Sequence, residues 1–150
     1  MKRGSTHEAA PGRANNVARI FDRLAATALG LVFVVYAWSK FSGNQFMHFE
    51  IYDRVVDVHP VTLVWYFFGY SKTYAMFLAC GELVAGLLVL IPWTARIGYP
   101  LYFMIAANIT VVDWSFGLPP QATWLATSLL VGSFYLLVRE RRAYVRLLGS

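Results

Sequence analysis

Four long apolar runs divide the chain, and polar residues bound each of them. They cover residues 24–39, 74–91, 97–112 and 122–138. With flanking Tyr, Trp or Thr residues, each run approaches the ~20 residues needed to cross hydrocarbon. Because backbone polar groups in lipid must be satisfied within their own segment, these runs should be helices. The pattern therefore predicts an all-α fold, a bundle of four transmembrane helices with spans at about 20–41, 73–91, 95–113 and 121–138.

The segment between the first two spans, residues 42–72, is too long for a simple connector. Phe46, Phe49 and Tyr52 recur there at helical spacing, opposite charged residues, which predicts an amphipathic helix in the outer interface that ends before Pro60. The next stretch, "VTLVWYFFG" from Val61, is apolar but too short to span. We expect it to form a short re-entrant helix or a lid pressed onto the bundle.

Polar segments flank the predicted membrane domain, residues 18–142. Residues 1–17 have no apolar period, so on their own they should be disordered. Residues 139–150 form a basic C-terminal tail. Within the domain, "DWSFGLPPQ" predicts a tight outer turn between the last two spans, and Pro92 closes the second span.

The charges are few and unevenly distributed. Charged residues make up 14% of the chain, whereas a soluble domain carries about 25%. Ten of the thirteen Lys and Arg residues lie on one side of the predicted bundle; the other three are Lys40, Arg54 and Lys72. Because positive charge is retained on the cytoplasmic side, both termini should be cytoplasmic. The basic balance then reflects orientation and contact with lipid headgroups, and no basic patch interleaved with stacking aromatics indicates a nucleic-acid partner.

Intrinsic redox or metal chemistry has no support in the sequence. Cys80 is the single cysteine, which excludes an internal disulfide and a CxxC centre. The spans lack paired histidines for haem, and His48 and His59 match no standard metal-ligand spacing. No nucleophile elbow, GxGxxG or HExxH motif is present. We therefore expect no metal and no intrinsic cofactor, and any activity would require a partner.

Glu82 is the only charged residue between Tyr74 and Ile91. On a helix its face is shared by small residues, whereas bulky ones occupy the opposite face. Small residues line helix–helix contacts in membranes. Glu82 should therefore point into the bundle, together with Ala75, Ala79, Ala85 and Gly86.

Other polar residues are placed to join Glu82. Lys40 closes the first span, Tyr36 lies one turn before it, and Asn108 lies in the third span. We predict that these four residues border a polar pocket in the outer half of the bundle. By the helix rise, Glu82 lies about 10 Å deeper than Lys40, which favours a water-bridged pair over a direct one.

The role of this cluster is open at the level of the residues. An ionisable group inside a membrane costs roughly 2.5 kcal/mol or more, so it is a functional candidate by default. Three roles are open for Glu82 together with Lys40 or Asn108: fixing the register of the helices, forming a ligand or proton site, and making an intersubunit contact. Arg96, Asp113 and Lys72 are secondary candidates, and Asp113 and Lys72 are interpreted as solvated charges at the membrane boundary.

Three segments carry a resemblance to a known family. They are "YAWSKFSG" at the end of the first span, "ACGELVAGLLVLIPWTARIG" through the second, and "MIAANI" in the third. In their order of Lys40, Glu82 and Arg96, residues 20–140 resemble the DoxX-like family of small four-helix membrane proteins. The resemblance implies a bacterial inner membrane protein.

Some DoxX-like proteins are similar to membrane subunits of thiosulfate:quinone oxidoreductase. The resemblance therefore implies an accessory subunit of a redox membrane complex, with quinone or lipid as the pocket's ligand and other membrane subunits as partners. Two alternatives remain: a purely structural subunit of a larger assembly, and a small transporter. Four helices without an inverted repeat give little room for alternating access, so a transporter would have to be a homo-oligomer.

Overall fold

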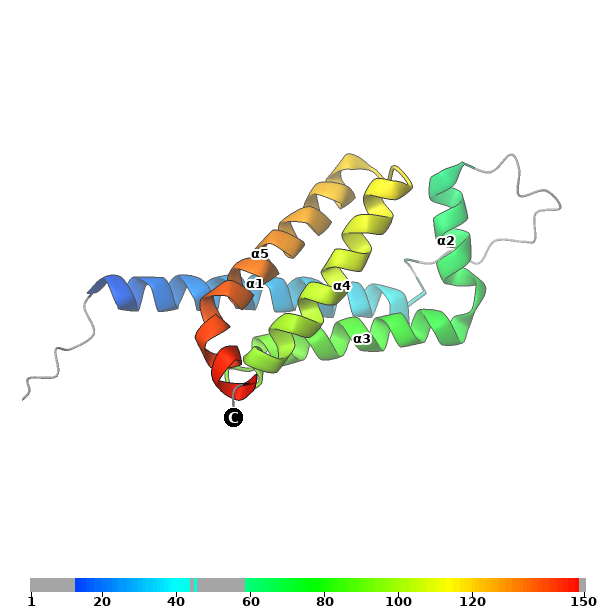
Figure 1. Ribbon diagram of the computed structural model, residues 1–150. Helices are drawn as coiled ribbons and strands as arrows, with labels where there is room; N and C mark the ends of the chain where they lie inside the picture. The colour runs from blue at the N-terminus through cyan, green and yellow to red at the C-terminus, as the bar shows by residue number, and fades with distance from the viewer. Residues whose placement is uncertain (1–12, 44, 46–58, 149–150) are drawn as a thin grey trace, which may run out of the picture.

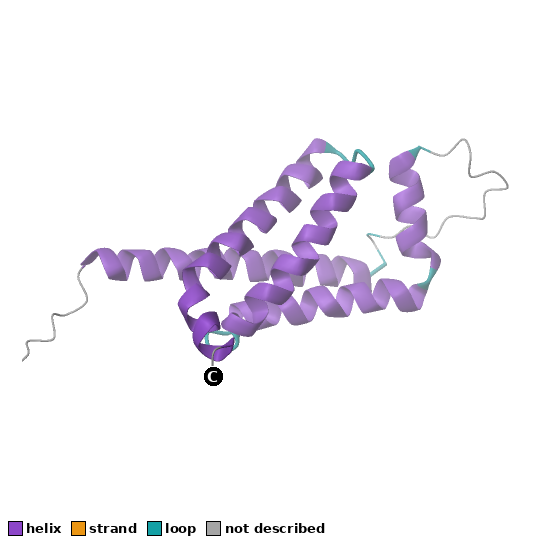
Figure 2. Cartoon of the chain, in the orientation of Figure 1, coloured by secondary structure: helices purple, strands orange, loops and turns teal. Residues whose placement is uncertain are grey.

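The computed structural model describes residues 13–43, 45 and 59–148. These residues form five helices: α1 (Arg13–Phe41), α2 (Pro60–Tyr70), α3 (Lys72–Leu90), α4 (Ala95–Ser115) and α5 (Pro120–Leu148). No strand occurs in the part of the chain that the structure describes (Figure 2). Every helix except α2 is long and apolar enough to cross a membrane. The protein is an integral membrane protein, and the predicted all-α bundle of four spans is confirmed.

The spanning helices form two antiparallel pairs (Figure 1). α1 packs along α3, and α4 packs along α5. The pairs meet where residues 91–94 join α3 to α4, and they diverge toward residues 116–119, which join α4 to α5. We call the first end the closed end and the second the open end. The short helix α2 stands at the open end, beside the diverging helices.

Small residues permit the close packing of α1 against α3. The buried face of α3 consists of Glu82, the predicted small residues and Val89, while Phe77 on the opposite face is 70% exposed. A Cβ atom placed on Gly86 would lie 2.9 Å from the Gly30 carbonyl oxygen, and one on Gly30 would lie 2.9 Å from that of Gly86. Such an approach of two backbones requires glycine on both helices.

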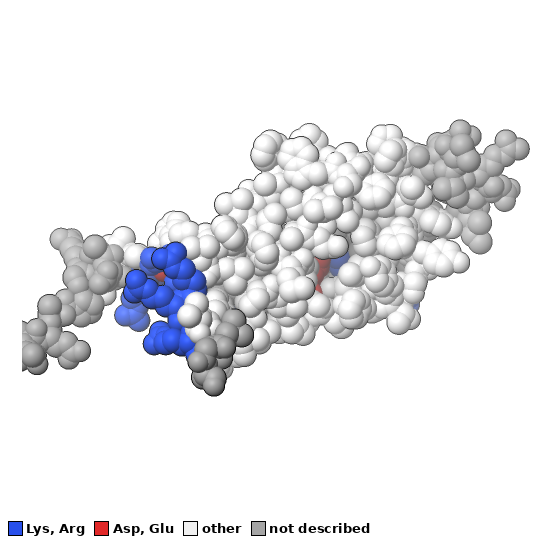
Figure 3. Space-filling model, in the orientation of Figure 1, with Lys and Arg blue, Asp and Glu red and all other residues white. Residues whose placement is uncertain are grey.

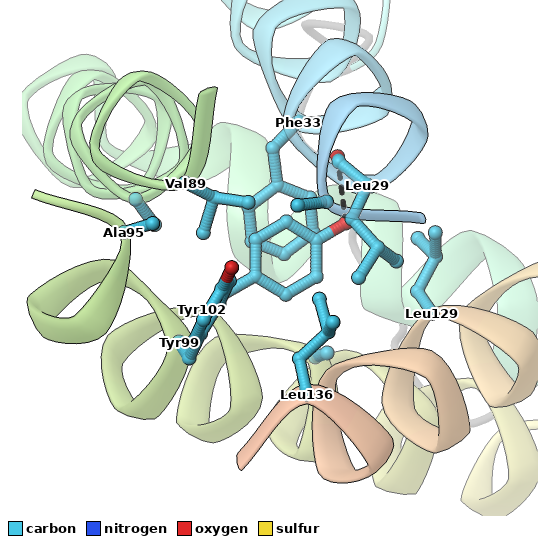
Figure 4. Close-up of a cluster of buried hydrophobic side chains, with 11 residues drawn as sticks. Leu29, Phe33, Val89, Ala95, Tyr99, Tyr102, Leu129 and Leu136 are labelled. Atoms are coloured by element: carbon cyan, nitrogen blue, oxygen red, sulfur yellow. Dashed lines mark hydrogen bonds between the residues drawn. The ribbon is translucent and has the colours of Figure 1, made fainter. Parts of the chain in front are cut away.

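The core of the closed half is built around two aromatic rings. Phe33 of α1 stacks on Tyr102 of α4, with ring centroids 3.6 Å apart. Both side chains are completely buried. The Tyr102 hydroxyl donates a hydrogen bond of 2.9 Å to the Leu29 carbonyl oxygen, so its polar end is satisfied (Figure 4). These contacts fasten α4 to α1 below the region where the helices diverge.

The longest helices exceed their predicted spans at the closed end. α1 begins at Arg13, so residues 13–17 are helical rather than part of a disordered tail. α5 continues to Leu148, through most of the predicted C-terminal tail. Arg139 binds Asp22 at 3.0 Å, and the Tyr144 hydroxyl donates to the Arg96 carbonyl oxygen at 2.7 Å. These contacts hold the extra turns of α5 against its neighbours.

The segment between α1 and α3 is only partly described. The apolar stretch from Val61 forms the helix α2, which begins at Pro60, a residue suited to the first turn of a helix. The predicted amphipathic helix over residues 46–57, with His48, lies outside the described residues, as do residues 1–12. The predicted tight turn is present at residues 116–119, where Gly117 adopts φ of 63°.

Candidate intramembrane ligand pocket

A cavity of about 500 Å³ lies in the open half of the bundle. All five helices contribute to its wall, and apolar side chains make up most of the lining. The charged residues among the lining are Lys40, Glu82 and Asp113. Figure 3 shows acidic and basic atoms together at the floor of a hollow, with uncharged surface immediately around it. The volume lies in the range of small-molecule sites in proteins.

Lys40 and Glu82 form a direct ion pair inside the bundle. The Lys40 Nζ atom lies 2.6 Å from Glu82 Oε2, and the residues are 6% and 3% exposed. The prediction of a bridging water is therefore wrong. It compared backbone depths, whereas helical side chains tilt toward the N-terminus of their own helix. On antiparallel helices, Lys40 leans inward from the end of α1 and Glu82 leans outward along α3, so the two side chains converge.

An aromatic ring supports the ammonium group. Lys40 Nζ lies 5.6 Å from the centroid of the Tyr36 ring, within reach of a cation–π interaction. The Tyr36 side chain also lies within electrostatic reach of both Glu82 and Asp113. The structure thus brings Lys40, Glu82 and Tyr36 together on one wall of the cavity.

Asp113 is buried rather than solvated. It is 6% exposed and lines the cavity, so the prediction of a solvated charge is wrong, although the residue does lie near the end of α4. The turn after α4 folds back over it: the Leu118 amide donates to the Asp113 carbonyl oxygen at 3.0 Å, and Leu118 is itself buried. No side chain in the described part of the chain donates a hydrogen bond to the Asp113 carboxylate. This carboxylate is therefore available to a ligand or a proton.

Two amide side chains add unsatisfied polar groups to the lining. Asn108 borders the cavity but is classed as exposed, and its amide has no hydrogen-bond partner among the described residues. The Gln45 Oε1 atom is buried, and within the described part of the chain it has no partner. Polar groups removed from water need hydrogen bonds, so these amides favour a polar group on whatever fills the cavity.

The other secondary candidates lie away from the cavity. Arg96 lies at the closed end, where its Nε atom is 2.9 Å from Glu140 Oε2 in an exposed ion pair. Lys72 is an exposed residue at the beginning of α3. Neither residue lines the cavity.

Sequence reasoning assigned no pocket role to α2. Val64, Trp65 and Phe68 of this helix line the cavity, and Val64 is 3% exposed. The apolar run itself could have indicated this role, because a helix too short to span must pack its apolar side chains against another part of the protein. Nothing in this run indicates which part of the bundle the helix covers.

Comparison with known proteins identifies one informative relative. No protein-family model matches the chain, and no solved structure matches it. The uncharacterized protein YwoB of Bacillus subtilis (strain 168) is 33% identical over 117 residues, covering 78% of this chain and 75% of the relative. The chain belongs to the YwoB family. Because the alignment is far longer than any one span, the similarity to YwoB extends over most of the bundle.

Proposed function

We propose that this YwoB-family protein is an accessory membrane subunit of a redox complex, and that its cavity holds a lipid-soluble ligand of the quinone class. The observation that carries the proposal is the cavity's composition. An apolar space large enough for a substituted ring contains a buried ion pair, a buried carboxylate and an unpartnered amide. The resemblance of the Lys40, Glu82 and Asn108 segments to DoxX-like proteins supports the same class of ligand.

The polar groups of the cavity suit the chemistry of a quinone headgroup. Its carbonyl oxygens accept hydrogen bonds, and the ammonium of Lys40, the amide of Asn108 and the hydroxyl of Tyr36 are donors. Reduction of a quinone to a quinol takes up two electrons and two protons. Glu82 and Asp113 are the lining carboxyl groups that can exchange protons. The sequence carries no haem or iron–sulfur motif, so in this proposal a partner subunit supplies the electrons.

The proposed location is the cytoplasmic membrane of a bacterium, with the closed end and both termini at the cytoplasm. The uneven distribution of Lys and Arg supports this orientation. In Figure 3 the largest basic cluster covers the closed end. The Bacillus relative supports a bacterial setting. The cavity then lies in the outer half of the membrane.

The test is quinone binding by the purified protein and by variants of the lining. Wild-type protein in lipid nanodiscs is titrated with a short-chain quinone analogue. Asn108→Leu should weaken binding at least about tenfold, the loss of roughly one hydrogen bond, without loss of fold, because the Asn108 amide has no described partner. Glu82→Gln should also weaken binding. Glu140→Gln is the control, since Glu140 belongs to the exposed pair at the closed end.

Two results would contradict the proposal: no binding by the wild type, or equal affinity in all variants. The direct geometry of the Lys40–Glu82 pair also suits a second function, a purely structural subunit whose ion pair holds α1 and α3 in register. That function predicts that Glu82→Gln changes stability but is mild in its effect on ligand affinity, and that removing residues 1–17 or reshaping residues 42–72 disperses a complex extracted in mild detergent.

A further inference from the structure

Two side chains in the wall between α3 and α4 face the cavity and the outside of the bundle at once. Phe77 of α3 and Met104 of α4 line the cavity, yet they are 70% and 69% exposed. Both lie within spanning helices, where an outward-facing side chain meets hydrocarbon. A wall made of such side chains does not separate the cavity from the lipid.

The glycines of α3 and α4 show that the two helices pack more tightly in the closed half than in the open half. A Cβ atom on Gly98 would lie 2.8 Å from backbone atoms of Leu88 and Val89, so α4 touches α3 at the closed end. A Cβ atom on Gly81 would have the Ile105 Cδ1 atom, at 3.9 Å, as its nearest neighbour. This is an ordinary van der Waals distance, so a methyl group fits between the two helices at Gly81, which lines the cavity.

A polar group stands in the same wall. Asn108, one turn after Met104 on α4, is exposed and has no hydrogen-bond partner among the described residues. An unsatisfied amide at a lipid-facing position is unfavourable, because hydrocarbon offers it no partner. The headgroup of a molecule passing between the two helices would satisfy it.

Two buried apolar residues cover part of the cavity at the open end. Val64 of α2 and Leu118 of the turn after α4 line the cavity, and they are 3% and 6% exposed. Both are apolar. An aqueous solute entering past them would lose its hydration against side chains that offer no hydrogen bonds.

We propose that the gap between α3 and α4, bordered by Phe77, Gly81, Met104 and Asn108, is a lateral portal through which a lipid-soluble ligand enters from the hydrocarbon. The ligand is a molecule with a polar head and an apolar tail. Its head reaches the Lys40–Glu82 pair, and its tail remains in the portal. The proposal rests on the proposed ligand cavity, but the route of entry holds whatever the headgroup is.

The first experiment measures how fast a short-chain quinone analogue binds in nanodiscs when the portal is narrowed. Gly81→Leu should slow association at least about tenfold by placing a branched side chain in the gap. Cys80→Leu is the matched control, because Cys80 is the adjacent residue on α3, is exposed, and does not line the cavity. An unchanged rate in Gly81→Leu would overturn the portal. Met104→Phe narrows the gap from the α4 side, and it replaces Gly81→Leu in this experiment if that variant does not fold.

The second experiment needs no quinone. Trp65 lines the cavity, and replacing Trp38, Trp93, Trp114 and Trp124 by Phe leaves it as the only tryptophan. Lipids brominated on the acyl chain quench tryptophan fluorescence on contact. If chains enter through the portal, Gly81→Leu should clearly reduce the quenching of Trp65, and Cys80→Leu should not.

The two experiments separate the two proposals. If the wild type binds no quinone but Gly81→Leu reduces quenching, the proposed function is wrong and the portal stands. Suppose instead that quinone binds, that Asn108→Leu lowers its affinity, and that Gly81→Leu changes neither the association rate nor the quenching of Trp65. The portal is then wrong and the proposed function stands.

Discussion

The two halves of the bundle use the same kinds of residue for opposite purposes. In the closed half, Gly30, Gly86 and Gly98 are pressed against backbone, and the hydroxyl of Tyr102 is hydrogen bonded. In the open half, Gly81 has room for a methyl group, and the amide of Asn108 has no partner among the described residues. Glycine serves close packing in one half and room for a ligand in the other. Polar groups are satisfied by the protein in the closed half and left partly to an occupant in the open half.

This contrast assigns stability to one half and binding to the other. Close backbone contact and stacked rings gain dispersion energy without a change in solvation, which is the main attraction between helices in lipid. A cavity forgoes those contacts. The Lys40–Glu82 pair is the exception, because it binds α1 to α3 within the open half. Three predictions sharpen or break this comparison.

The largest expected effect comes from breaking the buried pair. Lys40→Met leaves the Glu82 carboxylate without its ammonium and should lower the free energy of unfolding by about 3–5 kcal/mol. Lys40→Met combined with Glu82→Leu removes both charges and should recover most of that loss. Unfolding by sodium dodecyl sulfate, followed by circular dichroism, measures both. If the double variant were as unstable as Lys40→Met, the loss of stability would not come from the unpaired charge of Glu82.

A smaller effect is expected from a single methyl group at the closed end. Gly98→Ala places its Cβ atom against the backbone of α3 and should cost about 1–3 kcal/mol in the same unfolding assay. Gly81→Ala adds the same methyl group at 3.9 Å from its neighbour and should be neutral or slightly stabilising, since alanine favours the helix. Equal losses in the two variants would remove the distinction between the halves.

The smallest effect is expected from the exposed ion pair at the closed end. The Arg96 and Glu140 side chains are 61% and 37% exposed. Solvent screens such a pair, so Glu140→Gln should change the free energy of unfolding by at most about 1 kcal/mol, with no change in ligand affinity. A loss comparable to that of Lys40→Met would mean that this end depends on charge rather than on packing.

Much of this architecture is predictable from local sequence. Apolar runs gave the spans, and the small residues around Glu82 gave its inward direction, because helical periodicity relates sequence spacing to a face. The predictions that failed depend on contacts with neighbouring segments, which helical periodicity does not identify. The burial of Asp113 follows from Leu118 folding over the end of α4, and the direct Lys40–Glu82 contact follows from the tilt of two side chains on antiparallel helices.

The position of α2 was the least predictable feature of the fold. Its apolar side chains indicate that it packs against a surface, but nothing in "VTLVWYFFG" specifies the wall of the cavity. The helical ends beyond the predicted spans were missed for a related reason. Residues 139–148 are too polar to appear as a span, and their contacts with Asp22 and Arg96 join positions far apart in the sequence.

The apolar lining of the cavity has a thermodynamic consequence. With the proposed portal open to hydrocarbon, a space of about 500 Å³ does not stand empty in a membrane, because most of its lining is apolar and suits acyl chains. Acyl chains are its default occupant. Binding is therefore an exchange, in which each ligand replaces a segment of lipid. The measured affinity therefore compares the ligand with the lipid that it displaces, and both concentrations are mole fractions in the bilayer. The affinity should vary with the chain length and unsaturation of the lipid even when every contact between protein and ligand stays the same.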